Sequence, residues 1–146
     1  MDYTIYTDGA YSRKHNEGAF AYVMLDKDGN EVKRFSKKIT NETNNRAELK
    51  AIIAGIYHLP ADAKHIKVIS DSRYALHTLF GTWARNANND LFDKFDEIMK
   101  HKKCEVEWAW IRGHSGNKYN ELCDQLCNDV LGYDANEEYN KYKKQS

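Results

Sequence analysis

The spacing of hydrophobic residues changes from the strand period of two to a helical period near Thr43, which limits the folds open to this chain. Before this point, β-branched and aromatic residues alternate over 3–7, a pattern typical of a strand. Residues 18–25 and 31–39 flank the turn-rich segment 26–30, and this arrangement predicts an antiparallel hairpin. The first part of the chain is therefore expected to form antiparallel strands.

The second part alternates between helical and strand patterns. The spacing of Leu49, Ile52, Ile53 and Ile56 predicts one face of an amphipathic helix, and the only proline, Pro60, follows its end. The other helical stripes are Leu76, Leu79, Phe80 and Trp83, then Leu91, Phe92, Phe95, Ile98 and Met99, and finally Leu122, Leu126 and Val130. Strands are predicted at 66–70 and around Val106, Trp108 and Trp110. Helical connections between strands imply parallel pairing with right-handed crossovers, so we predict an α/β fold.

The chain length of 146 residues allows a single hydrophobic core. We predict one folded domain over 1–134, followed by a polar C-terminal tail over 135–146. The N-terminus enters a strand pattern without a charged and then apolar leader, and no apolar run reaches membrane-spanning length. These features predict a protein that does not associate with membranes.

Three cysteines are present, and their odd number argues against a disulfide framework. None has zinc-ligand spacing with a histidine. Cys123 and Cys127 lie four residues apart on a helical stretch, so we interpret them as reduced thiols packed in a helix face. This use of cysteine predicts a reducing, cytoplasmic compartment.

Four carboxylates in separate local contexts are the candidate chemical groups: Asp8, Glu48, Asp71 and Asp124. Asp8 and Asp71 are expected to end two parallel strands, whose carboxyl ends meet at one edge of a sheet. At an effective dielectric constant of ~20, two such charges ~4 Å apart repel by roughly 4 kcal/mol. Protons or hard cations must therefore neutralise the cluster. An oxygen-only site favours Mg²⁺ or Mn²⁺ over zinc, and the chemistry that it suggests is two-metal phosphoryl transfer.

Four motifs in this order and spacing resemble type 1 ribonuclease H over residues 3 to about 132. They are Thr-Asp-Gly-Ala at 7–10, Thr-Asn-Asn-Arg-Ala-Glu-Leu at 43–49, Ser-Asp-Ser-Arg-Tyr at 70–74, and Gly-His-Ser-Gly-Asn with Asn-Glu-Leu-Cys-Asp within 113–124. The resemblance implies a ribonuclease H-like fold, a mixed five-stranded sheet of three antiparallel strands and then two parallel ones, flanked by helices. It also implies endonucleolytic hydrolysis of the RNA strand of RNA–DNA hybrids by a catalytic domain at 1–134, leaving 5′-phosphate and 3′-hydroxyl ends.

The resemblance also assigns roles to particular residues. Asp8, Glu48, Asp71 and Asp124 match the family's ligands for two Mg²⁺ ions, for which Mn²⁺ is a possible substitute. His114 matches a histidine that assists proton transfer or product release. The expected substrate-binding residues are Thr43, Asn44, Asn45, Ser72 and Trp83. The implied partner is an RNA–DNA hybrid, and the expected oligomeric state is a monomer.

The chain departs from the family pattern in two segments. Many relatives carry a glycine- and proline-rich loop where this chain has 11–17, and a Lys/Arg- and Trp-rich protrusion where it has 81–90. The formal net charge of zero is also unusual for a nucleic-acid-binding protein. In the second segment, Trp83 could stack on the DNA strand or pack in the core.

Two other functions compete with this one. One is a catalytically inactive hybrid-binding module, although retaining clustered acids without metal chemistry would only destabilise the fold. The other is a related ribonuclease H-like nuclease that cuts DNA, which the Asn-Asn-Arg-Ala-Glu and Gly-His-Ser-Gly contexts disfavour.

Overall fold

Five strands form a single mixed sheet in the computed structural model, which describes residues 1–134. They are β1 (Asp2–Ser12), β2 (Glu17–Asp26), β3 (Glu31–Thr40), β4 (His65–Ser70) and β5 (Glu105–Trp110). Their order across the sheet is β3-β2-β1-β4-β5. The first three strands pair antiparallel, and β4 and β5 continue the sheet in parallel with β1, as predicted. The polar tail predicted at 135–146 lies outside the described residues.

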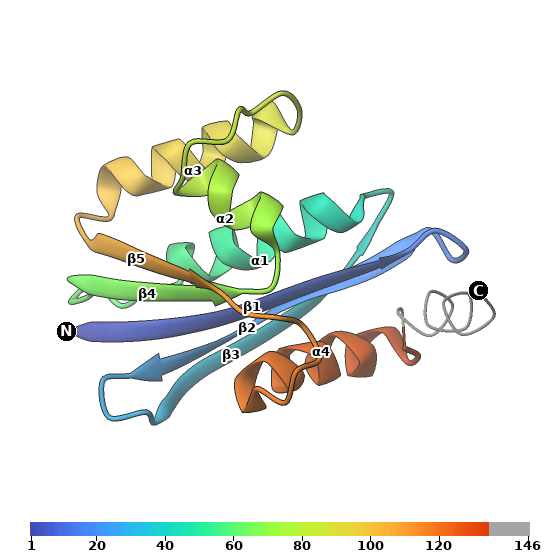
Figure 1. Cartoon of the computed structure of the whole chain (residues 1–146), viewed down its shortest axis with the longest axis horizontal. Helices are drawn as coiled ribbons and strands as arrows, with labels where there is room; N and C mark the ends of the chain where they lie inside the picture. Colours follow the sequence, from blue (N-terminus) through green and yellow to red (C-terminus); the bar gives the residue numbers. More distant parts are fainter. Residues whose placement is uncertain (135–146) are drawn as a thin grey trace.

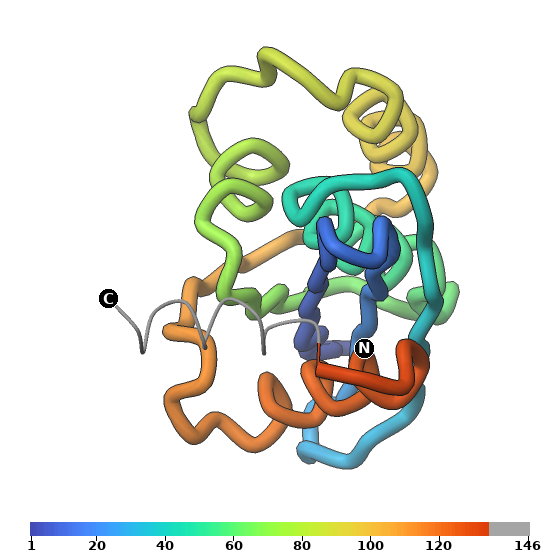
Figure 2. Tube along the Cα trace, turned by 90° about the vertical axis from the view of Figure 1, so that its right-hand side faces the viewer, coloured from blue at the N-terminus to red at the C-terminus, as the bar shows by residue number. Residues whose placement is uncertain are grey.

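Four helices cover the two faces of this sheet. They are α1 (Asn44–Tyr57), α2 (Arg73–Leu79), α3 (Asn89–His101) and α4 (Lys118–Leu131). Figure 1 shows α4 on one face, with α1, α2 and α3 on the other, and the view from the side in Figure 2 shows the same separation. None of the helices within 1–134 is long and apolar enough to cross a membrane.

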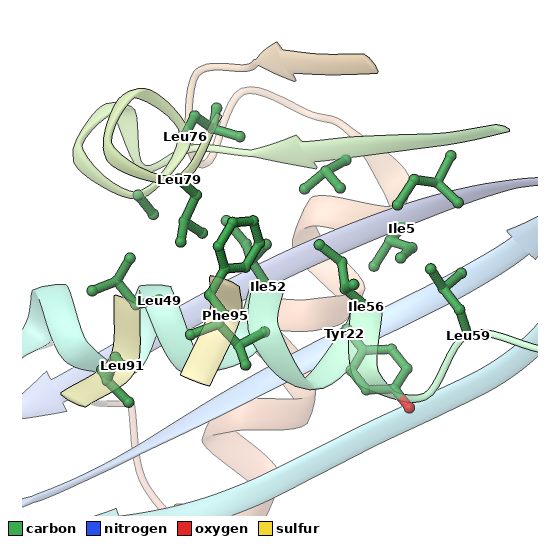
Figure 3. Close-up of a cluster of buried hydrophobic side chains, with 14 of the residues drawn as sticks. Ile5, Tyr22, Leu49, Ile52, Ile56, Leu59, Leu76, Leu79, Leu91 and Phe95 are labelled. Atoms are coloured by element: carbon green, nitrogen blue, oxygen red, sulfur yellow. The ribbon is translucent and has the colours of Figure 1, made fainter. Parts of the chain in front are cut away.

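The larger core lies between the sheet and the three helices on its upper face in Figure 1. Ile5 of β1 and Tyr22 of β2 pack in one cluster with Ile52 and Ile56 of α1, and all four are fully buried (Figure 3). Phe95 of α3 is buried in the same cluster. The helical stripes predicted for α1 and α3 therefore do face this core.

The smaller core lies under α4, the helix that Leu122, Leu126 and Val130 predict. Val130 is 37% exposed and the two leucines are half-buried, so they flank the packed face rather than form its centre. Cys123 and Cys127 are fully buried in that face, as predicted. They pack against the small side chains of β2, which are Ala19, Ala21 and Val23. Small partners let the helix approach the strand closely, so thiols fill the space; both remain free cysteines, as predicted.

Candidate active site

Asp8 lies inside β1, so the prediction that it ends a strand is wrong. The parallel register of β1 with β4 stops where Tyr6 faces Ile69, and β1 then continues to Ser12, paired only with β2. Strand β1 continues past Asp8 because β2 still provides hydrogen-bond partners beyond the end of β4. Asp71 directly follows β4, and the carboxylates of Asp8 and Asp71 still meet at the same edge of the sheet.

Glu48 reaches this edge from α1, whose first turn is fixed by a capping residue. The side chain of Thr43 accepts a hydrogen bond from the main-chain N–H of Arg46 and starts the helix. One turn later Glu48 is 5% exposed, and its Oε1 accepts a hydrogen bond from the N–H of Gly9 at 3.1 Å. The contact requires glycine, because a Cβ at position 9 would lie 2.6 Å from the carbonyl carbon of Ala47.

The structure brings three of the four predicted carboxylates into one tight group. One carboxylate oxygen from each of Asp8, Glu48 and Asp71 lies within 4.8 Å of the others. Around them is a polar pocket of about 250 Å³, whose other lining residues are Gly9, Asn44, Ser72 and His114. Oxygen atoms from a strand, a helix and a strand end therefore converge on one small volume.

Burial raises the pKa of each carboxyl group in this cluster, and repulsion from neighbouring carboxylates adds to it. Burial is the main cause of the raised pKa of Asp8 and of Glu48, and the charge of Asp71 raises both further. The Oε2 atom of Glu48 is buried without a hydrogen-bond partner among the described residues. A hard divalent cation would satisfy this atom and offset the repulsion, and the oxygen-only donor set suits Mg²⁺ or Mn²⁺. The residues present thus fit the predicted metal.

Asn120 is a site residue that the sequence analysis missed. It lies in the first turn of α4, is 3% exposed, and its side chain hydrogen-bonds to Asp71. Burial raises the pKa of Asp71, whereas this hydrogen bond and the nearby charge of His114 lower it. The signal available in the sequence was its spacing, because Asn120 lies three residues before Cys123 and seven before Cys127 and so shares the packed face of that helix.

Asp124 lies on α4 outside the tight group. Its negative charge still raises the pKa of Asp8 and of Asp71, so it lies within electrostatic range of the pocket. Its own pKa is raised, mainly by burial, and His114 lowers it. The side-chain amide of Asn128 donates a hydrogen bond to Asp124 Oδ2 at 3.4 Å. Asp124 therefore influences the pocket electrostatically from α4, on the opposite face of the sheet from α1, without being one of the lining residues.

The predicted substrate residues occupy different places around the pocket. Asn44 and Ser72 line it, whereas Thr43 and Asn45 are exposed beside it at the start of α1. Ser72 also caps α2 by accepting a hydrogen bond from the N–H of Ala75 at 3.1 Å. The helix cap at α1 is Thr43, so neither asparagine is needed for that purpose.

Trp83 lies outside both the core and the pocket. Helix α2 ends at Leu79 rather than continuing to residue 83, and Trp83 is 48% exposed. Its indole stacks on the ring of His77, with 4.4 Å between ring centroids and 12° between ring planes. The core role is therefore wrong, and one face of the aromatic side chain is available on the surface.

Comparisons with known proteins agree with this architecture. The RNase H family profile matches residues 1–131. The chain is 33% identical to a Ribonuclease H of Treponema denticola, covering 86% of this chain and 94% of the relative. It is 36% identical to a Ribonuclease H of a Thermoanaerobacter species, covering 87% and 88%.

Two solved structures have a similar fold. The RNase H of the halophilic archaeon Halobacterium salinarum matches with a TM-score of 0.75 and 25% identity, covering 90% of this chain and 98% of that one. The N-terminal RNase H domain of a Mycobacterium tuberculosis protein matches with a TM-score of 0.76 and 21% identity, covering 90% and 94%. The second likeness concerns the fold alone.

Proposed function

The chain belongs to the ribonuclease H family, and we propose that it hydrolyses the RNA strand of RNA–DNA hybrids endonucleolytically with the help of divalent metal ions. The products would carry 5′-phosphate and 3′-hydroxyl ends. The observation that carries the proposal is the convergence of Asp8, Glu48 and Asp71 within 4.8 Å in a polar pocket. Three buried carboxylates so close together destabilise the fold when no cation is bound. A role in metal-assisted chemistry would explain why the fold nevertheless brings them together.

Asp8, Glu48 and Asp71 would hold two Mg²⁺ ions, with Asp124 completing the ligand set from α4. When bound, the ions supply activation of the attacking water and stabilisation of the leaving oxygen, and Mn²⁺ would serve in their place. Asn120 would orient the Asp71 carboxylate and favour its ionised form through their hydrogen bond. Asp8 lies on β1, Glu48 on α1 and Asp124 on α4, whereas Asp71 lies in the connection between β4 and α2.

His114 would move a proton at the mouth of the pocket. It lies on the loop between β5 and α4 with a positive φ of 56°, and its ring is exposed beside Asp71 and Asp124. An imidazole can both donate and accept a proton, so His114 would deliver one to the leaving 3′-oxygen and be reprotonated from solvent. We therefore assign it to proton transfer rather than to metal binding.

Selection of the RNA strand would depend on groups beside the pocket. A hybrid of A-like form presents 2′-hydroxyls across a wide minor groove, and an asparagine amide can both donate to and accept from them. Asn44 and Ser72, which line the pocket, and the exposed Thr43 and Asn45 beside it would make these contacts. The exposed indole of Trp83 would stack against the DNA strand.

We also propose that the protein acts as a monomer in a reducing, cytoplasmic compartment. All three cysteines are free, and two of them are fully buried, which suits a compartment that keeps thiols reduced. Light scattering at micromolar concentration would test the monomer, since a concentration-dependent mass would contradict it.

A cleavage assay on four labelled substrates tests the function. The substrates are an RNA–DNA hybrid, single-stranded RNA, double-stranded RNA and double-stranded DNA, each with and without Mg²⁺. We expect Mg²⁺-dependent internal cleavage of the hybrid RNA strand alone, with 3′-hydroxyl ends that a polymerase can extend. Hybrid binding without cleavage would identify an inactive binding module, and cleavage of duplex DNA would identify the DNA-cutting alternative.

A further inference from the structure

Asp71 differs from the other two clustered carboxylates in that it lies in neither a strand nor a helix. Asp8 is held in the ladder of β1, and Glu48 is held in the second turn of α1. Asp71 follows the last residue of β4 and precedes Ser72, the N-cap of α2. Regular backbone hydrogen bonding therefore does not fix its position, and other contacts must do so.

The indole of Trp110, the last residue of β5, supplies one such contact. Its Nε1–H donates a hydrogen bond to the main-chain oxygen of Asp71 at 3.0 Å. The next residue extends the parallel pairing, because the N–H of Ile111 donates to the main-chain oxygen of Ser70 at 3.0 Å. The guanidinium of Arg73 lies over the Trp110 ring, 4.1 Å from its centroid.

The loop after β5 limits the position of the Asp71 carboxylate itself. A Cβ built at Gly113 would lie 2.6 Å from Asp71 Oδ2, closer than real contacts allow. The φ of Gly113 is not in the positive range, so the backbone there does not require glycine. Space for the carboxylate is thus the reason that the structure gives for glycine at this position.

We propose that Trp110 and Gly113 are positioning residues for Asp71: the first fixes its main chain and the second leaves room for its carboxylate. Trp110 and Gly113 do not line the pocket, yet they would fix the position of Asp71 relative to Asp8 and Glu48. This inference rests on the proposed function, because Asp71 matters only if the cluster binds divalent ions. Residues that orient metal ligands are typically worth about 10–100-fold in metal affinity or activity.

Trp110→Phe tests the hydrogen bond, because it keeps an aromatic ring under Arg73 and removes the donor. We expect Mn²⁺ affinity, measured by calorimetry without substrate, to fall about tenfold. The Mg²⁺ concentration for half-maximal cleavage should rise with it, while KM for the hybrid at saturating Mg²⁺ stays within about twofold. The matched control is Trp108→Phe, two residues earlier on the same strand, where the indole packs against His77. This control should change Tm without changing metal affinity.

Gly113→Ala is the second variant, and Gly116→Ala is its control. Gly116 lies in the same loop at a φ of +92°, where alanine strains the backbone but a Cβ meets nothing within 4 Å. Only the change at 113 should weaken Mn²⁺ binding, even if both variants lower Tm.

The outcomes separate the two proposals. A wild-type protein that neither binds Mn²⁺ nor cleaves the hybrid would overturn the proposed function together with this inference. An active wild type whose Trp110→Phe and Gly113→Ala variants keep normal Mn²⁺ affinity would overturn the inference alone. So would a raised hybrid KM with unchanged metal affinity, because the indole would then be a substrate contact.

Discussion

The main-chain N–H of Gly9 donates to Oε1 of Glu48 at 3.1 Å, and this bond joins the residue after Asp8 to the helical carboxylate. It therefore sets the separation of two pocket carboxylates. The approach is close, since a Cβ at position 9 would lie 2.6 Å from backbone atoms of α1 that cannot rotate away.

Gly9→Ala should move α1 away from β1 and weaken metal binding. Overpacking of this kind costs typically about 1–3 kcal/mol of folding free energy. We expect a lower midpoint in urea unfolding and an at least tenfold loss of cleavage at fixed Mg²⁺, by analogy with misplaced metal ligands. The control is Gly29→Ala, in the turn between β2 and β3, where a φ of +82° strains alanine but a Cβ meets nothing within 4 Å, so stability should fall while cleavage stays normal. Normal cleavage by Gly9→Ala would show that the close approach is dispensable.

The ion pair between Arg46 and Asp90 should make stability depend on pH in the acid range. Two parallel hydrogen bonds of 2.9 and 2.7 Å join them, and the guanidinium lowers the pKa of Asp90 to about 2. Because the folded pKa lies below the ordinary value of about 3.9, the pair stabilises the fold above that pH. This stabilisation is lost as the pH falls from about 4 to about 2.

Asp90→Asn should therefore lower Tm at neutral pH by a small amount, with the difference from wild type closing by about pH 2. Asp93→Asn, an exposed change on the same helix, provides the control for the loss of one acidic charge. Thermal unfolding followed by circular dichroism at several pH values checks this. A difference that stays constant with pH would mean that the ion pair does not stabilise the fold.

His114→Ala should lower kcat without weakening metal binding. A positioned proton donor is typically worth about 10²–10⁴-fold, which sets the upper limit of the loss. Hybrid affinity, measured in Ca²⁺ to prevent turnover, should stay nearly unchanged because His114 lies on the pocket rim. A calorimetric loss of Mn²⁺ binding comparable to that of Asp8→Asn would instead make His114 a metal ligand.

Asn45→Ala should raise KM for hybrids, because each lost hydrogen bond to a 2′-hydroxyl costs about 0.5–1.5 kcal/mol, roughly 2–12-fold. Stability should change little, since Thr43 rather than Asn45 caps α1. Thr43→Ala provides the comparison and should lower Tm, as loss of a cap costs typically ~1 kcal/mol. If Asn45→Ala leaves KM and kcat untouched, the residue does not contact substrate.

The order of helices and strands along the chain and the meeting of Asp8 and Asp71 at one edge of the sheet could be predicted from local patterns, whereas the mixed five-stranded sheet was implied by the family resemblance. The change of hydrophobic period placed the helices between parallel strands, and this connection brings Asp8 and Asp71 to one edge of the sheet. The packing of Cys123 and Cys127 in a face of α4 is also confirmed. What the sequence could not identify is that this face lies on the alanines of β2, because a hydrophobicity pattern along one helix contains no information about its partner.

The supporting residues of the site were also beyond sequence patterns. Trp110 appeared only as one position of an alternating strand, and its bond to Asp71 depends on two strands meeting in register. Trp83 was predicted at helical spacing, yet α2 ends at Leu79 and leaves it on the surface. Tertiary contacts decide both positions, and they link residues distant in sequence.

The central claim is that the clustered carboxylates bind the ions that drive hydrolysis, and Asp8→Asn tests it most directly. Burial and neighbouring charges raise the pKa of Asp8, so its ionised form destabilises the metal-free fold as the pH rises through that pKa. The decisive measurement is cleavage of a labelled RNA–DNA hybrid by Asp8→Asn in saturating Mg²⁺, with Tm in EDTA as the test of folding. We predict no detectable cleavage and a Tm equal to or above that of the wild type. Substantial Mg²⁺-dependent cleavage by the folded variant would contradict the account.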